Sequence, residues 1–157
     1  MLGSNPSDRF SSRKGGGQVE PVPRAVMDLT QQLNQAMPFG AVLGLEVIAA
    51  SAEEVRARLG WAEERCTAGG VMHGGAMMAL ADSTGGFCAF LNLPADATGT
   101  ATIESKTNFF AAVREGWVEA VSRPLHVGRT TIVVDTDLFD EQGIRVARVT
   151  QTQAVLR

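Results

Sequence analysis

Hydrophobic and polar positions follow three distinct patterns along this 157-residue chain. Glu53–Leu59 alternates charged and apolar side chains with a period of two, which is typical of a half-buried strand. Gly75–Leu91 is apolar at nearly every position and is too long for a strand, which favours a buried helix. From Gly99 onward, runs rich in β-branched residues alternate with short turns. The pattern predicts one apolar helix together with many strands.

These patterns place the predicted elements in a definite order. A short helix over Asp28–Met37 is expected to end at Pro38, and a polar loop over Trp61–Gly70 is expected to lead into the apolar helix. Strands are predicted over Ala41–Ala50, Glu53–Leu59, Thr102–Val113, Gly116–Arg123, Arg129–Phe139 and Ile144–Leu156. Because short turns join the last four strands, with Arg114–Gly116 expected as a hairpin loop, these strands favour an antiparallel meander.

The apolar helix sets the expected architecture because it has no polar face. Such a helix should be covered on most sides, and one long, curved antiparallel sheet wrapped around it would provide that cover. The small residues of the helix, Ala79 and Gly85 among them, would let the sheet approach closely. We therefore predict an α+β fold with a single domain over residues 24–157. Residues 1–23 are rich in Gly, Ser, Pro and charge and are expected to form a disordered tail.

Composition and charge narrow the possible functions. A formal net charge of −3 argues against sequence-independent nucleic-acid binding. Two cysteines, Cys66 and Cys88, are too few for a disulfide framework, and the N-terminus has no secretory signal, so a cytoplasmic location is expected. Asp82, inside the longest apolar run, argues against a membrane span. The only two histidines, His73 and His126, are far apart in the sequence, which argues against a zinc site.

The lone acid of the apolar helix is the first candidate for chemistry. Asp82 and Asp96 are the only charged side chains between Arg65 and Glu104. Burial disfavours the ionised form of a carboxylate and makes it a stronger base, so Asp82 is a candidate general base or nucleophile. The competing interpretation is a structural acid that is satisfied by a neighbouring hydroxyl.

The helix begins at His73-Gly74-Gly75, a sequence that suits the binding of a developing oxyanion. The first N–H groups of a helix have no intrahelical partner, and the helix dipole is positive there. Glycine at both positions lets a substrate carbonyl come close to the backbone. The competing interpretation is that His73 only starts the helix, with its side chain hydrogen-bonded to the backbone.

Three stretches, in this order, carry a resemblance to a known family. They are GGVMHGGAMMALADSTGG, TIESKTNFFAAVREG and LHVGRTTIVVDTDLFDEQGIRVARVTQTQ. Together they resemble the hotdog-fold acyl-CoA thioesterases, in particular the phenylacetate-degradation (PaaI-like) type. The resemblance implies a sheet wrapped around the helix and homodimers with one continuous sheet, which stack further into tetramers. It also implies acyl-CoA thioester substrates, with no metal or redox cofactor.

The resemblance also implies roles for individual residues. Asp82 would act as general base or nucleophile, the Gly74 N–H would bind the thioester oxygen, and His73 would orient the turn. Thr67 stands where several relatives have an asparagine that contacts the substrate carbonyl or the attacking water. Thr102 aligns with a Ser or Thr near that water.

Further candidates concern substrate binding. Gly75 and Ser83 flank the implied catalytic residues and are candidate substrate contacts. For the nucleotide part of coenzyme A, the Gly128-Arg129 pair in HVGRT could meet a phosphate as it enters a strand. The weaker candidates for this contact are Lys106, Arg123 and Arg145.

Helix geometry adds an expectation that does not depend on the family. Gly74 and Asp82 are eight residues apart, which is about 12 Å along a helix and about 80° around its axis. A thioester carbon must lie within about 3–3.5 Å of the attacking atom. The two groups of one helix therefore do not easily serve one carbon. If both are catalytic, each site must combine Gly74 of one subunit with Asp82 of another, which predicts two composite sites per homodimer.

Two other functions remain open at this point. One is an acyl-thioester hydratase or dehydratase of the same fold, which would hydrate an enoyl thioester. The other is a non-catalytic acyl-CoA-binding protein, which would bind without turnover. The sequence leaves the acyl group open as well, since aryl-acetyl, aroyl and medium-chain groups all suit a pocket lined by Phe and Met.

Overall fold

The computed structural model describes residues 24–157, so the expected tail over residues 1–23 lies outside the described residues. Two helices, α1 (Arg24–Ala36) and α2 (Pro38–Leu43), lead into strands β1 (Glu46–Ala50) and β2 (Val55–Gly60). A 3₁₀ turn (Glu63–Arg65) and the short strands β3 (Cys66–Thr67) and β4 (Val71–Met72) precede the long helix α3 (Gly74–Leu91). The chain then forms β5 (Gly99–Phe109), β6 (Trp117–Val127), β7 (Thr131–Asp140) and β8 (Arg145–Leu156).

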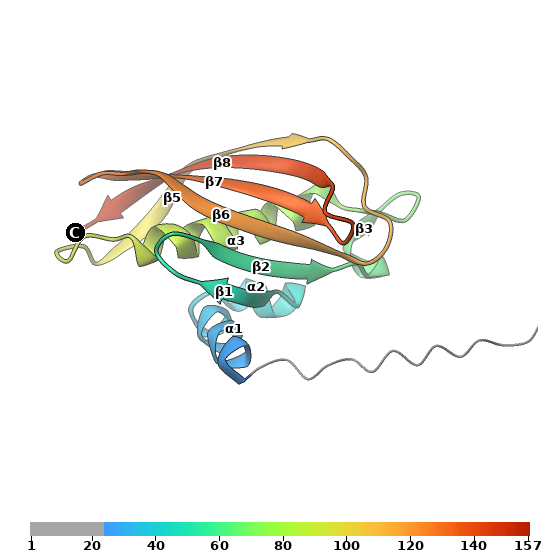
Figure 1. Ribbon diagram of the computed structural model, residues 1–157, viewed down its shortest axis with the longest axis horizontal. Coiled ribbons are helices and arrows are strands. Elements are labelled where there is room, and N and C mark those ends of the chain that lie inside the picture. The colour runs from blue at the N-terminus through green and yellow to red at the C-terminus, as the bar shows by residue number, and fades with distance from the viewer. Residues whose placement is uncertain (1–23) are drawn as a thin grey trace, which may run out of the picture.

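Six strands form one antiparallel sheet in the order β1-β2-β6-β7-β8-β5. The sheet curves over α3, which runs along its concave face, while α1 and α2 lie beside β1 (Figure 1). Alternate residues of β2 are fully buried toward the helix, as the period-two pattern of Glu53–Leu59 predicted, and β7 shows the same alternation. The expected α+β arrangement of a sheet wrapped around one helix is confirmed.

Helix α3 packs one face against the sheet and leaves the other partly open. Met77, Leu80 and Cys88 are buried in the core that this face shares with the strands. On the other face Met78 is 40% exposed and Phe90 is 54% exposed. The helix is thus covered on most sides, as expected, and a single chain leaves only a strip of it exposed: Gly75, Met78, Asp82, Phe90 and Leu91.

The expected four-strand meander is only partly correct. β6, β7 and β8 are consecutive neighbours, but β5 pairs with β8 at the far edge of the sheet, and β6 pairs with β2 instead. Arg114–Gly116 is thus no hairpin loop but the end of a crossover. This crossover is fixed by backbone hydrogen bonds, since Phe110 N–H donates to the Val146 carbonyl and Met72 N–H donates to the Val113 carbonyl.

The N-terminal prediction also needs correction. Pro38 follows the first helix but also begins α2, because proline at the first position of a helix gives up an N–H that would be unpaired anyway. The strand expected over Ala41–Ala50 consequently starts only at Glu46, after Gly44 ends α2 with a φ of 71°. The expected polar loop over Trp61–Gly70 contains the 3₁₀ turn and β3, and β4 follows it directly. None of the helices between residues 24 and 157 is long and apolar enough to cross a membrane.

Leu80 offers a direct test of this packing. It is fully buried between α3 and the sheet, so Leu80→Ala should lower the free energy of unfolding by about 2–5 kcal/mol, because it leaves a cavity in the core. Leu125→Ala is the matched control, since Leu125 is 62% exposed on β6 and should cost no more than about 0.5 kcal/mol. Urea unfolding at one protein concentration, followed by tryptophan fluorescence, measures both. Equal losses for the two variants would contradict the packing of α3.

Candidate functional site

Asp82 lies in the middle of α3, on the helix face that the sheet does not cover. Its side chain is exposed in the single chain, which corrects the expectation of a buried carboxylate: the helix is apolar, but position 82 points away from the core. The side chain lines a cavity of about 490 Å³ between α1, α3 and the start of β5. The other lining residues are mostly apolar: Gln32, Leu33, Ala36, Met37, Gly86, Phe87, Phe90, Gly99, Thr100, Thr102 and Gln153.

Hydrogen bonds fix one oxygen of the Asp82 carboxylate. The Thr102 hydroxyl donates to Oδ1 over 3.2 Å, and the Gln151 amide Nε2 donates to the same atom over 2.6 Å. Gln153 in turn donates from Nε2 to the Thr102 hydroxyl over 2.9 Å. Oδ2 makes no hydrogen bond to any described residue, so it is the carboxylate oxygen left open to a ligand.

The N-terminus of α3 is capped by a side chain, as the competing interpretation of His73 expected. His73 caps the helix, and its Nδ1 accepts a hydrogen bond from the Gly75 N–H over 2.8 Å. This bond occupies the Gly75 N–H, which therefore is not free for a substrate. The Gly74 N–H has no partner among the described residues, so it is the available donor.

The Gly74 end of the helix lies in a different hollow from Asp82. Gly74 lines a shallow groove together with Thr67 of β3 and the rings of Phe109 and Phe110. A Cβ atom at Gly74 would approach Phe109 Cζ to 3.0 Å, so glycine gives this groove its depth. Asp82 is not among the groove residues, and Gly74 does not line the Asp82 cavity. Within residues 24–157 the two candidate groups thus lie in separate hollows.

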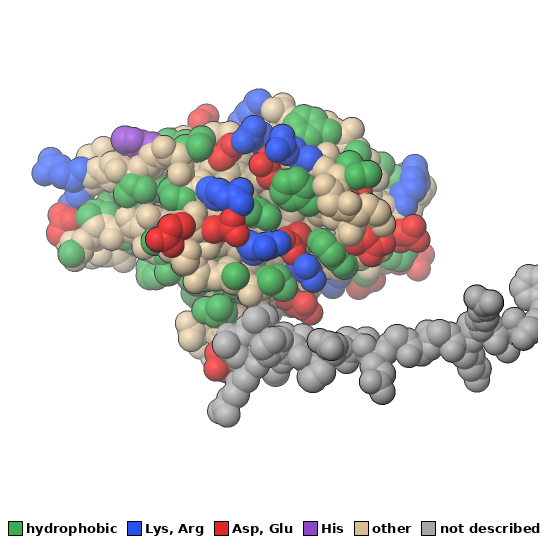
Figure 2. All heavy atoms as spheres, in the orientation of Figure 1, with side chains coloured by type: hydrophobic (Ala, Val, Ile, Leu, Met, Phe, Trp, Pro, Cys, Tyr) green, Lys and Arg blue, Asp and Glu red, His purple; other side chains and the backbone are tan. Residues whose placement is uncertain are grey.

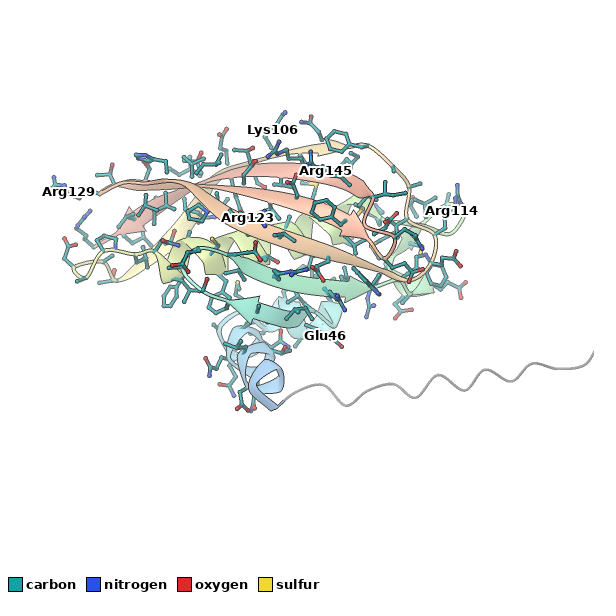
Figure 3. All side chains as sticks on the ribbon, in the orientation of Figure 1. Glu46, Lys106, Arg114, Arg123, Arg129 and Arg145 are labelled. Carbon is teal, nitrogen blue, oxygen red and sulfur yellow. The ribbon has the colours of Figure 1, made fainter. Side chains whose placement is uncertain are left out.

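Other residues predicted for the site lie elsewhere. Ser83 is buried and does not line the Asp82 cavity. Gly128 and Arg129 form the turn between β6 and β7, and Figure 3 shows Arg129 at one tip of the sheet. The Arg129 carbonyl accepts a hydrogen bond from Arg157. The Arg129 guanidinium makes no ion pair with any described residue, whereas Arg157 pairs with Asp96.

The weaker cation candidates lie on the sheet rather than near the carboxylate. Arg123 pairs with Glu54, and Arg145 pairs with Asp137 over 3.1 Å. Figure 2 shows such basic and acidic side chains side by side over the sheet, and Lys106 lies on the edge strand β5 in Figure 3. Arg123 and Arg145 thus each have an acidic partner on the sheet, whereas no ion pair of Arg129 occurs within the described residues.

The buried thiol and the acidic groups offer no alternative centre. Burial raises the pKa of the Cys88 thiol to about 11, so Cys88 stays protonated and non-nucleophilic near neutral pH. No three His, Cys, Asp or Glu side chains gather in metal-binding fashion between residues 24 and 157.

Gln151 and Gln153, which are both almost fully buried on β8, were not predicted from the sequence. A signal was present, because the period of two places them on the same face as Val149 and Val155. Two amides on the core face of a strand need hydrogen-bond partners, and one of these partners is the only acid of the helix. The closure of the cavity by Leu33 and Met37 of α1 was not predicted either, since no contact between α1 and α3 is visible in a linear pattern.

Comparisons with known proteins agree on one family. Residues 69–147, which include Gly74 and Asp82, match the thioesterase superfamily. The chain is 30% identical to ComA2 of Bacillus subtilis (strain 168) over 131 residues, which are 83% of this chain and 99% of that protein. It is 33% identical over 87 residues to the 1,4-dihydroxy-2-naphthoyl-CoA hydrolase of Escherichia coli (strain K12), covering 55% of this chain and 63% of that enzyme.

Solved structures give the same result. The fold matches a mutant of the phenylacetic acid degradation protein PaaI from Thermus thermophilus with a TM-score of 0.68 at 26% sequence identity. The match covers 76% of this chain and 99% of that one. The similarity therefore extends over almost the whole length of that protein.

The role of His73 as a helix cap can be measured by stability. His73→Ala removes the acceptor of the Gly75 N–H and should lower the free energy of unfolding by about 0.5–2 kcal/mol. His73→Asn retains a side-chain acceptor at the cap and should lose much less. Thermal and urea unfolding of both variants check this difference. Equal stability of the two variants would show that the cap contributes nothing.

Proposed function

The chain belongs to the thioesterase superfamily, and from this premise we propose that it hydrolyses acyl- or aryl-acyl-CoA thioesters to the free acid and coenzyme A. The expected resemblance to the hotdog thioesterases is confirmed, and the chain is a thioester hydrolase. Coenzyme A enters as part of the substrate, and the proposed chemistry calls for no other cofactor. The proposed location is the cytoplasm.

One observation carries the assignment of the site. Asp82 Oδ2 has no partner among the described residues and lines an apolar cavity of about 490 Å³, while Oδ1 is held by two donors. This volume lies within the range of about 300–1,000 Å³ that is usual for small-molecule sites. An apolar cavity beside one reactive carboxylate suits an acyl chain with its carbonyl at the mouth.

The proposed reaction uses this carboxylate and one helix N-terminus. Asp82 takes a proton from a water molecule, whose oxygen attacks the thioester carbon, and the carbonyl oxygen becomes an oxyanion bound by the Gly74 N–H. When the oxyanion collapses, the carbon–sulfur bond breaks. The coenzyme A thiolate then takes up the proton that Asp82 received from the water molecule. Direct attack by Asp82 would instead give a mixed anhydride that water then hydrolyses. Both routes need the same two groups.

We propose that the two groups come from different subunits of a homodimer. In one chain they lie in separate hollows, about 12 Å apart along α3. The edge of β5 that does not pair with β8 is open in the single chain and carries exposed apolar residues, including Ile103 at 61%. Two copies that pair these edges would form one continuous sheet and cover the exposed face of α3. Dimers of such dimers are the proposed assembly.

The lining residues favour a flat or flexible apolar acyl group. Phe87 and Phe90 come from α3, and Leu33 and Met37 come from α1, so two aromatic rings and two aliphatic side chains surround the space. The Escherichia coli relative is named for an aryl-CoA substrate, which supports aryl-acyl groups as substrates here. For the phosphates of coenzyme A we propose Arg129, whose guanidinium has no ion pair within the described residues.

Asp82→Asn tests the assignment of the carboxylate. The amide can neither accept a proton nor attack the thioester, so kcat should fall by about 10²–10⁴-fold. Asp96→Asn is the matched control, because Asp96 is an exposed acid that pairs with Arg157 away from the cavity, and it should retain the wild-type kcat. Free coenzyme A released from a panel of acyl-CoA thioesters, with an enoyl thioester included, measures turnover and separates hydrolysis from hydration.

The outcomes of this assay are distinct. Near-normal turnover by folded Asp82→Asn would contradict the mechanism. Hydration of the enoyl thioester without release of coenzyme A would contradict the proposed function itself. Binding of the panel without any turnover by the wild-type protein would favour a binding protein.

Gly74→Pro tests the shared site. Proline lacks the backbone N–H, yet it suits the first position of a helix, so the oxyanion donor is lost while α3 can still form. Gly74→Ala is the matched control, because it places a Cβ against Phe109 but keeps the N–H. Gly74→Pro should lower kcat by about 10²–10³-fold relative to Gly74→Ala.

Mixing the two inactive proteins then tests which subunit supplies each group. In a mixed dimer the Asp82→Asn subunit still supplies Gly74, and the Gly74→Pro subunit still supplies Asp82, so one complete site forms. An equimolar mixture that exchanges subunits at random should regain about a quarter of the wild-type activity. If mixed dimers form and remain inactive, the shared site is wrong.

A further inference from the structure

Gln151 is a fully buried side chain of β8 that reaches the proposed catalytic acid. Its Nε2 lies 2.6 Å from Asp82 Oδ1 and 3.4 Å from the Asp82 backbone carbonyl. We infer that Gln151 is the positioning residue of the site: it holds the Asp82 carboxylate so that Oδ2, and not Oδ1, is the oxygen that reacts. This inference rests on the proposed use of Asp82 in catalysis.

The hydrogen bonds that reach Asp82 run in one direction when its carboxylate is ionised. An ionised carboxylate only accepts, so the Gln151 amide must present its NH₂ group, because the flipped amide would place two oxygens 2.6 Å apart. Thr102 Oγ1 accepts from Gln153 Nε2, which leaves its own proton for Asp82 Oδ1. Thr100 Oγ1 lies 3.1 Å from Gln153 Oε1 and 2.9 Å from the Ala154 carbonyl, so its single proton serves two acceptors. Gln151 and Thr102 therefore both donate to Asp82, and Gln153 supports Thr102.

The consequence concerns the two carboxylate oxygens. Oδ1 receives both hydrogen bonds, one from Gln151 and one from Thr102. Oδ2 receives none from the described residues, so its lone pairs remain available at the cavity for a water proton or a thioester carbon. Because Gln151 is buried and Asp82 is exposed, the strand fixes the rotamer of a side chain that would otherwise turn freely in solvent.

The surroundings of Gln151 indicate that the amide is there for this contact. Its Oε1 is buried and has no hydrogen-bond partner among the described residues. Burying an unpaired oxygen is unfavourable, and an apolar side chain at this position would avoid that cost. A Cβ atom at Gly85 would come within 1.9 Å of Oε1, so glycine in the middle of α3 makes room for the amide. Glycine is unfavourable inside a helix relative to alanine. The Gln151 amide therefore costs stability twice, through its unpaired Oε1 and through the glycine at position 85 of the helix. The hydrogen bond to Asp82 is the contact that the amide makes in return.

The experiment compares variants of the full-length protein in the coenzyme A release assay. Gln151→Met keeps the volume of the side chain but cannot donate, so kcat should fall by about tenfold to a hundredfold. KM should change little, because the residue does not line the cavity. Ser122→Ala is the matched control: Ser122 is buried on β6 and bonded only to Thr136, so its loss affects stability without affecting the carboxylate.

A second variant reaches the same contact from the helix. Gly85→Ala would displace the Gln151 amide and should lower kcat to a similar extent, although alanine favours the helix. In a Gln151→Ala background there is no amide to displace, so adding Gly85→Ala should lower kcat no further.

These results separate the inference from the proposed function. A loss of kcat in Gln151→Met and Gly85→Ala, without additivity, supports the positioning role. An unchanged kcat in folded Gln151→Met, or a full additional loss from Gly85→Ala in the Gln151→Ala background, would overturn it. If the wild-type protein released no coenzyme A, the proposed function would fail instead. If Asp82→Asn were inactive while Gln151→Met kept its activity, only this inference would fail.

Discussion

The spacing between the N-terminus of α3 and Asp82 is the constraint on which the rest of the molecule depends. A helix is rigid, so eight residues separate the free Gly74 N–H from the carboxylate by about 12 Å whatever the surrounding side chains do. One thioester carbon cannot touch both groups of the same helix. The separate hollows around the two groups reflect this spacing directly. The proposed dimer follows from this spacing, because it would bring Gly74 of one subunit to Asp82 of the other.

The sheet covers one face of this helix and supplies the side chains that hold Asp82. It encloses the face that carries Met77, Leu80 and Cys88, and it leaves the face with Asp82 open. The same sheet supplies Thr102 from β5 and Gln151 from β8, which hold the carboxylate from the enclosed side. Packing, hydrogen bonding and the open face thus all follow from how one helix lies in one curved sheet.

The sequence predicted the elements better than their connections. The helix was predicted over Gly75–Leu91 and observed over Gly74–Leu91, because an uninterrupted apolar run has few alternatives. The placement of β5 at the far edge was missed, because a turn sequence such as Arg114–Gly116 does not indicate whether the strands before and after it pair with each other. Pro38 was misread for a similar reason, since the same residue can follow one helix and begin another.

The candidate site was predictable where it depends on local sequence. His73 caps the helix that carries Gly74 and Asp82, and the spacing of these two residues alone predicts that they lie apart. The exposure of Asp82 was not predictable from an apolar run, because it depends on which face of the helix meets the sheet. Gln151 was missed because its partner lies 69 residues away in the chain.

The central claim is that one thioester meets groups from two subunits. A crystal structure with a non-hydrolysable acyl-CoA analogue, whose thioester sulfur is replaced by a methylene group, tests it most directly. The account predicts that the carbonyl oxygen accepts a hydrogen bond from the Gly74 N–H of one subunit, with the carbonyl carbon facing Asp82 Oδ2 of the other. A carbonyl bound to Gly74 with no partner carboxylate near it, or an acyl group outside the cavity of about 490 Å³, would contradict the account.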